Sequence, residues 1–310
     1  MNHTNIINLS QKLHMLQAEL KKLTYGAIEI RETQNKKYLY VHYREDGVAF
    51  TKYIGEFSDE LANTILNNNQ QAKQIKKDIK SLQKDLELLG FKQHDLSPAV
   101  KTNIDFAKSM LVDTIHKQSV LEGISATFAD TQTIVEGGKV NNLTASEVMK
   151  VVNLKHAWEF VLNPNVIASD TNFALLSEIN RLVLEGFYYN AGMVRSTPVS
   201  IGGTSWKPPV PVEFQIKEEL QTILGSKLDT LTKAINLLIF VMKRQIFIDG
   251  NKRTAVIFAN HLLIKNSSGL IAIPDDKVDD YRTLLIEFYE TDNAEKITKF
   301  LKTQCYTKIN

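Results

Sequence analysis

The sequence has little cysteine, proline or glycine, and it lacks long hydrophobic runs. Cys305 is the only cysteine among 310 residues, so no disulfide can form within the chain; this fits a reducing compartment, and we expect a cytoplasmic protein. With only 7 prolines and 14 glycines, long disordered linkers are not expected. The longest apolar run, residues 237–242, is far too short to cross a membrane, and residues 1–10 lack the pattern of a signal peptide.

Neither sign of charge dominates the chain. The formal net charge is +2, which gives no electrostatic argument for a nucleic-acid or membrane partner. The composition, 43% hydrophobic and 23% charged, is that of a soluble globular protein, and 310 residues suffice for two ordinary domains.

Residues 1–92 predict a first domain that begins with a helix and a small sheet. Leucines recur there at alternating spacings of four and three, which is typical of a helix with one narrow apolar seam. These leucines are Leu9, Leu13, Leu16, Leu20 and Leu23. Three segments rich in Tyr, Val, Ile and Thr follow, with turn-forming residues between them, and they predict a three-stranded antiparallel meander. The predicted strands are residues 27–32, 38–44 and 49–54.

A long helix follows the predicted sheet and completes this domain. Ser58 or Asp59 is suited to cap its start, and Gly90 is suited to end it. Because the meander returns the chain, we expect the apolar seams of the two helices to pack together as an antiparallel pair. Aromatic residues are ordinary strand formers, and acidic residues interleave with the basic ones in the tyrosine-rich strands, so we expect no nucleic-acid partner for this sheet.

From residue 96 onward helical periodicity dominates, which predicts a mostly α second domain over residues 97–310. The predicted helices are interrupted at Gly123, at Asn163-Pro164, at Gly186 and at Gly250. One segment breaks the pattern: residues 194–201 alternate in hydrophobicity and are followed by glycines and prolines. This alternation predicts a short β-hairpin or an exposed edge strand inside a helical domain.

Residues 245–255 read Q-I-F-I-D-G-N-K-R-T-A and lie between two predicted helices. A glycine-containing loop that opens a helix gathers free backbone N–H groups and the positive end of the helix dipole, and this arrangement attracts phosphate. Lys252 and Arg253 add positive charge, and Arg253 can also bind a phosphate through two N–H groups. Asp249 supplies a hard oxygen suited to Mg²⁺. The sequence therefore predicts a nucleotide-phosphate site here.

The same loop resembles the signature motif of the Fic family, H-x-F-x-[D/E]-G-N-[G/K]-R, with Gln245 in the place of the histidine. Residues 191–203 resemble the family's flap, a β-hairpin that pairs with the backbone of a target protein. Residues 119–123 resemble its inhibitory motif, S/T-x-x-x-E-[G/N], although Gln118 stands where Ser or Thr is expected. The resemblance spans residues 97–303 and implies a Fic-type helical core with a β-hairpin flap.

The resemblance also implies a role for each matching residue. Phe247 would pack into the core and fix the loop, Asp249 would hold Mg²⁺, and Glu122 would inhibit productive nucleotide binding. The anion hole for ATP or a related nucleotide would comprise Gly250, Asn251, Lys252 and the phosphate-clamping Arg253. The flap residues that would bind a protein target are Val194, Arg195, Ser196, Thr197, Val199 and Ile201.

Two positions depart from the family pattern. The family histidine accepts the proton of the attacking hydroxyl, and a carboxamide such as Gln245 has no usable pKa for that task. Val256 stands where members that transfer AMP carry a second arginine, the usual partner of the inhibitory glutamate. The variant N-K-R-T-A resembles members of the Doc type, which transfer a phosphate. Glu122 is then expected either to repel phosphate directly or to pair with Lys252 or Arg253.

Two histidines, His116 and His261, are candidates for a substitute base, but a lone histidine on a helix is usually structural, and we expect that role for both. Trp206 is interpreted as a rigid anchor for the flap. No His/Cys/Asp/Glu cluster has the spacing of a transition-metal site.

Three functions remain open from the sequence. The first is a bacterial pseudoenzyme of the Fic type that binds ATP and Mg²⁺, transfers AMP poorly or not at all, and engages a protein target through the flap. The second is an active AMP- or phosphate-transferase that uses another base. The third is a non-catalytic interaction module in which the fold is only a scaffold. A homodimer is a partner arrangement that the sequence leaves open.

Overall fold

The computed structural model describes residues 9, 12–13, 15–17, 19–20, 22–33, 36–45, 48–88 and 96–309. The chain divides into two compact units, Met1–Gln93 and His94–Asn310, and each is treated by itself. The mostly helical fold class predicted from the sequence, with a small three-stranded sheet near the N-terminus, is confirmed.

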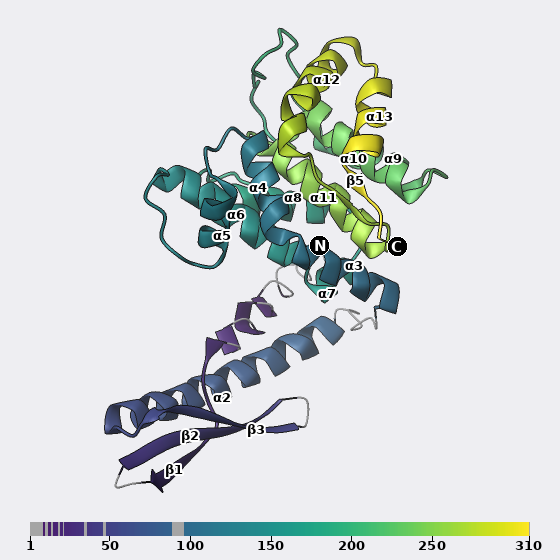
Figure 1. Ribbon diagram of the computed structural model, residues 1–310. Coiled ribbons are helices and arrows are strands. Elements are labelled where there is room, and N and C mark those ends of the chain that lie inside the picture. Colours follow the sequence, from purple (N-terminus) through teal and green to yellow (C-terminus); the bar gives the residue numbers. More distant parts are fainter. Residues whose placement is uncertain are drawn as a thin grey trace. The chain divides into compact units, whose positions relative to one another are not determined.

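The first unit contains the predicted antiparallel meander. Its strands β1 (Ala27–Thr33), β2 (Lys36–Glu45) and β3 (Val48–Glu56) follow one another in the sheet in chain order (Figure 1). Leu39 and Val41 of β2 point inward and form a core with Ile65 of the long helix α2 (Asp59–Leu88), because alternate residues of a strand face opposite sides. The sheet is therefore stabilised by the helix that covers one face.

The predicted antiparallel helix pair is also present in this unit. The described residues between 9 and 22 are helical, and Leu13 packs against Leu82 and Leu86 of α2. Closer to the sheet, Gln71 donates a hydrogen bond to Glu19 at 2.8 Å, so the two helices run in opposite directions. The Ser58 hydroxyl accepts a hydrogen bond from the backbone N–H of Leu61 at 3.1 Å and caps the start of α2. The predicted end at Gly90 lies outside the described residues.

The second unit is built from helices with two very short strands. Its helices are α3 (Pro98–Ser109), α4 (Leu111–Leu121), α5 (Phe128–Val135), α6 (Ala145–Val161), α7 (Pro164–Ala168), α8 (Phe173–Val183), α9 (Glu213–Gly225), α10 (Thr230–Arg244), α11 (Asn251–Lys265), η1 (Asp275–Lys277), α12 (Val278–Thr291) and α13 (Glu295–Gln304). The strands β4 (Leu270–Ile271) and β5 (Tyr306–Thr307) pair antiparallel. The sequence did not predict these two strands, since two residues carry no periodicity.

Helix α11 is the centre of this unit. Nearly all of its side chains are buried, and it packs against α8, α10, α6 and α3. A helix that is buried all round satisfies its polar side chains internally. The Asn260 carboxamide donates to the Ile271 carbonyl and accepts the Ile271 N–H. The His261 ring contacts the Thr171 hydroxyl and the Val166 carbonyl, each at 2.9 Å. Burial lowers the pKa of His261 to about 4, and we therefore assign it a structural role.

The predicted β-hairpin at residues 191–203 is wrong as a hairpin, because this segment contains no β-strand. Its backbone is fixed to the loop before α11, where the Arg195 N–H donates to the Ile246 carbonyl at 3.0 Å. Pro198 interrupts the segment and has no backbone donor for a ladder. We keep the name flap for residues 191–203, which form an irregular, partly extended loop.

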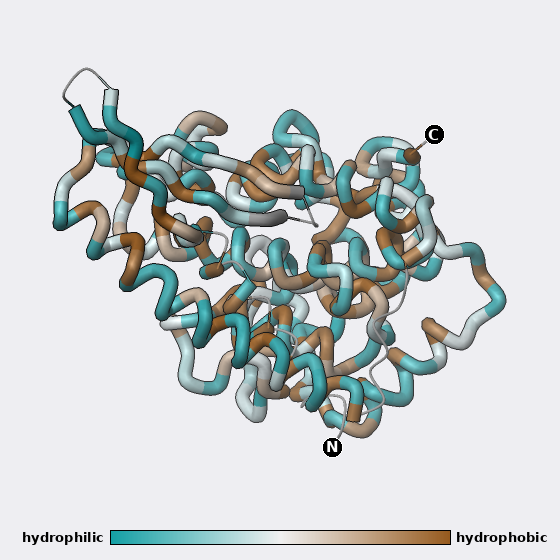
Figure 2. The backbone as a smooth tube through the Cα atoms, turned by 90° about the horizontal axis from the view of Figure 1, so that it is seen from below, coloured by the Kyte–Doolittle hydropathy of each residue, from teal (hydrophilic) through white to brown (hydrophobic). Residues whose placement is uncertain are grey.

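Hydrophobic stretches along the chain are short and broken by hydrophilic residues (Figure 2). In the part of the chain that the structure describes, no helix has the length and apolar character needed to span a membrane.

Candidate functional site

The site is built on the turn that joins α10 to α11. Helix α10 ends at Arg244, and the next residue, Gln245, has a left-handed backbone with φ 42° and ψ 58°. Gly250 is left-handed as well, with φ 71°, and it immediately precedes α11. A Cβ at Gly250 would approach Val183, Leu184 and the Asn180 amide at 3.1 to 3.3 Å. Glycine is therefore required there both by conformation and by close packing on α8.

Two asparagine side chains hold this loop in shape. The Asn251 carboxamide accepts the Phe247 N–H at 3.0 Å and donates to the Phe247 carbonyl at 2.8 Å. Phe247 is fully buried. Asn180 of α8 donates to the Asp249 carbonyl at 3.0 Å and to the Thr254 hydroxyl at 3.1 Å. Because its side chain braces the loop, Asn251 offers a ligand only its backbone N–H.

Positive charge gathers at the start of α11, in residues 250–253, which we call the cationic cradle. No side chain of the described residues caps this helix, so within that part of the chain the N–H groups of its first turn have no side-chain acceptor. The Arg253 side chain is only 2% exposed, yet its Nε and Nη1 atoms make no hydrogen bond within the described residues. Buried guanidinium groups are normally fully hydrogen-bonded. The cradle therefore combines positive charge with N–H groups that lack a hydrogen-bond acceptor.

Glu122 lies against the cradle. Its carboxylate is 3.4 Å from Arg253 Nε and 3.5 Å from Lys252 Nζ. Asp249 is the other carboxylate near Arg253, at 3.5 Å from Nη2. Of the two arrangements expected for Glu122, the structure shows the one in which it pairs with the cations of the loop.

Helix α4 is tied into place around Glu122. Gln118, at the position where the motif calls for Ser or Thr, donates to the Arg253 carbonyl at 3.4 Å and accepts from the Trp158 indole at 2.8 Å. On the opposite side, Arg282 of α12 donates to the Leu121 carbonyl at 3.0 Å. These contacts fix the end of α4, and with it the position of the Glu122 carboxylate.

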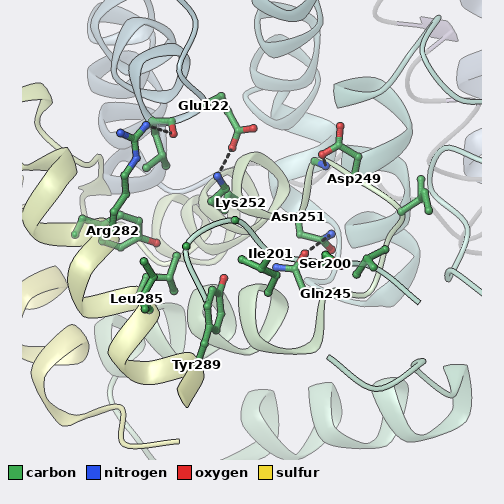
Figure 3. Close-up of a pocket in the computed structure, with 18 residues that line it drawn as sticks. Glu122, Ser200, Ile201, Gln245, Asp249, Asn251, Lys252, Arg282, Leu285 and Tyr289 are labelled. Atoms are coloured by element: carbon green, nitrogen blue, oxygen red, sulfur yellow. Dashed lines mark hydrogen bonds and ion pairs between the residues drawn. The ribbon is translucent and has the colours of Figure 1, made fainter. Parts of the chain in front are cut away.

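A pocket of about 500 Å³ opens over the cradle. It is lined by the end of α4, the second half of the flap, the loop before α11 and one face of α12 (Figure 3). At one side lie Glu122, Lys252 and Asp249; at the other, Leu285 and Tyr289 project from α12. One end of the pocket is thus charged and the other largely apolar.

The Gln245 side chain is held from two directions. It donates to the Met242 carbonyl at 2.7 Å and accepts from Asn251 at 3.2 Å. Burial raises the pKa of Tyr289 well above its usual range. Gln245 therefore lines the pocket without accepting a proton, and Tyr289 is a neutral hydroxyl there.

The flap residues fall into two groups. Val199 and Ile201 line the pocket, whereas Val194, Ser196 and Thr197 do not. The Arg195 side chain is only 2% exposed, so Arg195 could contact a target only through its backbone.

The Arg195 guanidinium instead donates to three backbone segments. It bonds the carbonyls of Gln245 at 2.6 Å, Thr197 at 2.7 Å and Pro209 at 2.6 Å. Trp206, after the flap, stacks on Tyr289 at 5.4 Å between ring centroids, which agrees with its interpretation as an anchor.

Val256 is fully buried in α11 and does not line the pocket. His116 pairs with Asp275 at 3.1 Å and also lies outside the pocket lining. Sequence reasoning missed the wall formed by α12, because Arg282, Leu285 and Tyr289 follow an ordinary helical pattern that carries no functional signal. The loop brace Asn180 was missed for the same reason.

The carboxylates of the site suit a magnesium ion only when a bound phosphate supplies further oxygen ligands. Among the residues that the structure describes, no group of three or more His, Cys, Asp or Glu side chains is placed to hold a metal. Asp249 is a single half-exposed carboxylate, one of whose oxygens accepts the Gly250 N–H at 2.6 Å. Mg²⁺ is commonly held by one or two carboxylates together with substrate phosphates and water, and Asp249 fits that pattern.

The fold and site together define a class of helical domain with a glycine loop at the start of a central helix. Residues 170–263 match the model of the Fic/DOC family, and the chain therefore contains a Fic/DOC domain. A comparison with curated protein sequences finds no match.

Solved structures of Fic proteins share the fold. A Fic domain-containing signalling protein from Bacteroides thetaiotaomicron is 16% identical, with a TM-score of 0.54 over 68% of this chain and 86% of that one. Fic-1 from C. elegans is 17% identical, with a TM-score of 0.51 over 79% and 77%. A Fic family protein from Desulfovibrio desulfuricans is 15% identical, with a TM-score of 0.52 over 67% and 72%.

Proposed function

We propose that the second unit binds a nucleoside triphosphate such as ATP together with Mg²⁺, and that it transfers AMP or phosphate to a protein hydroxyl poorly or not at all. The observation that carries this proposal is Arg253, a buried guanidinium whose Nε and Nη1 atoms make no hydrogen bond among the described residues, at the start of α11. The protein would act as a nucleotide-dependent binding module.

A phosphate group would resolve several features of the cradle together. The free N–H groups of the first turn of α11 and the helix dipole favour an anion. Arg253 offers Nε and Nη1, and Lys252 adds a charge at the pocket wall. Glu122 supplies only ion pairs longer than 3.3 Å, so an incoming phosphate oxygen can take the same donors at shorter distance. A phosphate of the ligand can therefore displace the Glu122 carboxylate from the cradle.

Asp249 would hold the magnesium ion against the bound phosphates. Bound Mg²⁺ neutralises phosphate charge and orients the phosphate groups. Asp249 lines the pocket, and Arg253 lies directly behind it, with Nη2 at 3.5 Å from the Asp249 carboxylate.

The missing element is a histidine base at the position of Gln245. Among the described residues that line the pocket there is no histidine, and the Gln245 carboxamide is hydrogen-bonded to Met242 and Asn251. The absence of a general base typically costs about 10² to 10⁴ in rate. Weak transfer is therefore the expected behaviour even with nucleotide bound.

A protein target would be engaged by the flap. Ser196 and Thr197 are exposed, and this stretch is not paired with a strand among the residues that the structure describes. Unpaired backbone groups of an extended segment can accept a strand of a partner. Amide hydrogen exchange with a bound partner tests this point: protection of residues 196–201 supports it, and unchanged exchange contradicts it.

The proposal is tested on the full chain by titration with MgATP, with adenosine and with magnesium tripolyphosphate, alongside an assay for covalent transfer of labelled nucleotide. We expect saturable binding of MgATP and of tripolyphosphate, weaker binding of adenosine, and transfer near background. Rapid transfer would favour an active transferase with another base. Absence of binding by all three compounds, also in a Glu122→Gly variant, would leave the fold as a scaffold only.

A further inference from the structure

The Glu122 carboxylate makes only long contacts in the cradle. Its oxygens lie 3.4 Å from Arg253 Nε and 3.5 Å from Lys252 Nζ, and Oε1 is buried without a hydrogen-bond partner among the described residues. A buried carboxylate oxygen that lacks a hydrogen bond costs free energy. The backbone that carries Glu122 therefore has to supply part of the restraint that keeps this side chain in place.

The end of α4 by itself is a poor support for a carboxylate. Glu122 follows the last residue of α4, at the negative end of the helix dipole. The last turn of the helix, residues 118–121, contains no basic residue that would offset the negative charge. The next residue, Gly123, is left-handed, and a Cβ there would meet none of the described atoms within 4 Å. The chain therefore leaves the helix without close packing, and the support has to come from another element.

Arg282 of α12 provides that support (Figure 3). Its Nη2 donates to the carbonyls of Leu121 at 3.0 Å and Val120 at 3.4 Å. The Leu121 carbonyl belongs to the peptide group that joins it to Glu122, so the guanidinium acts on the backbone of Glu122 itself. It also places a cation at the negative end of the α4 dipole. The other tie, from Gln118 to α11, lies one turn earlier in the helix.

We propose that Arg282 is a positioning residue that holds Glu122 in the cationic cradle and thereby weakens phosphate binding, an inference that rests on the proposed nucleotide binding. A cation on the wall of a phosphate pocket ordinarily strengthens phosphate binding through its charge. Here Nη2 is engaged by α4, and Asp279 lies 3.5 Å from Nη1. Loss of Arg282 therefore frees the end of α4, Glu122 leaves the cradle, and phosphate binds more tightly.

Calorimetric titration of the full chain with MgATP and with magnesium tripolyphosphate measures the sign of this effect. Arg282→Met keeps the aliphatic stem and removes the cation, and we expect both ligands to bind about three- to tenfold more tightly, the net contribution of one hydrogen bond. Arg282→Lys retains a cation that can donate to the same carbonyls, and it should restore the wild-type affinity. Lys277→Met is the matched control, because Lys277 pairs with Asp276 and bonds no carbonyl of α4 among the described residues; its affinity should not rise.

The double variant Arg282→Met with Glu122→Gly separates positioning from a merely structural role. Without the carboxylate Arg282 has nothing to position, so the double variant should bind MgATP no more tightly than Glu122→Gly alone. Amide hydrogen exchange on the unliganded protein gives a readout that needs no ligand. The N–H groups of Glu122 and Gly123 donate to carbonyls of the last turn of α4, and they should exchange faster in Arg282→Met.

Four results would overturn the inference while the phosphate site stands. They are weaker binding of both ligands by Arg282→Met in the presence of Glu122, unchanged affinity or unchanged exchange in that variant, an equal rise in affinity in Lys277→Met, and a further gain in the double variant. The first would mean that Arg282 contacts phosphate. Absence of binding in every variant, Glu122→Gly included, overturns the phosphate site itself and this inference with it.

Discussion

The cationic cradle and the position of Gln245 lie on the same loop, yet they differ in what remains available to a ligand. In the cradle, Arg253 is buried with two nitrogens that make no hydrogen bond among the described residues, and none of these residues caps the first turn of α11 with a side chain. At the other end of the loop, both ends of the Gln245 carboxamide are engaged by Met242 and Asn251. The cradle can therefore accept hydrogen-bond acceptors from a ligand, whereas the hydrogen bonds of the Gln245 carboxamide are already made within the protein.

This difference separates binding from chemistry within a single loop. The features that attract phosphate depend on backbone conformation, on the Gly250 packing and on two cations, and all of these are present. Proton transfer depends on one side chain with a suitable pKa. A chain can therefore lose the second property and keep the first.

The largest expected effect is that of Gln245→His on transfer. Histidine tolerates the left-handed backbone of this position better than most residues, and it restores a proton acceptor at the pocket. We expect the rate of labelled nucleotide transfer to rise by about 10²-fold or more. Gln245→Ala, which supplies no base, is the control and should show no gain.

A Gln245→His variant that binds nucleotide but shows no transfer would contradict this interpretation, because a feature other than the missing base would then limit the reaction. The next candidate for the limiting feature is Val256, which stands where the resemblance to members that transfer AMP calls for a second arginine. It is fully buried, so an arginine at that position would carry a large burial cost, and Val256→Arg is expected to destabilise the fold.

The second prediction concerns the occupant of the cradle. Glu122→Gly removes the carboxylate that pairs with Lys252 and Arg253, so MgATP should bind more tightly by about 1 to 3 kcal/mol, the range of coupling between two sites. Glu122→Gln keeps the shape and removes the charge, and it separates electrostatic from steric exclusion. Unchanged MgATP affinity in both variants would reduce residues 121–123 to a helix end.

The smallest expected effect is that of Gly250→Ala, compared with Gly123→Ala. Both glycines are left-handed, at φ 71° and φ 73°, but a Cβ at Gly123 meets nothing within 4 Å, whereas one at Gly250 presses on α8. Both variants bear a left-handed alanine, which costs about 1 kcal/mol. Gly250→Ala should lower the thermal midpoint further and also weaken nucleotide binding. Equal thermal midpoints in the two variants would show that α8 moves to accommodate the Cβ at position 250 without loss of stability.

The sequence predicted the elements whose causes are local. The meander, the cap at Ser58 and the start of α11 at Gly250 follow from residue alternation, capping chemistry and glycine conformation, and each was located to within a few residues. The cationic loop was found for the same reason, since its charged residues are consecutive.

The sequence could not predict features that depend on residues far apart in the chain. Arg195 looked like an exposed flap residue, but its carbonyl partners come from residues 245 and 208–209, and only the fold shows that they surround it. The alternation of the flap predicted a hairpin or an edge strand, yet residues 191–203 contain no strand, and none of the described strands pairs with them. Arg282 and Tyr289 complete the pocket from a helix whose pattern shows nothing unusual.

The most direct test of the account is the MgATP affinity of Arg253→Ala against that of Arg244→Ala, measured by calorimetry on folded protein with a checked melting temperature. Removing a charge-assisted pair of hydrogen bonds should weaken binding by about 100-fold or more in Arg253→Ala. The Arg244→Ala control should bind MgATP like the wild type, because Arg244 pairs with Glu219 of α9 and is not part of the cationic cradle. Equal affinities in the two variants would contradict the claim that the cationic cradle binds the phosphates.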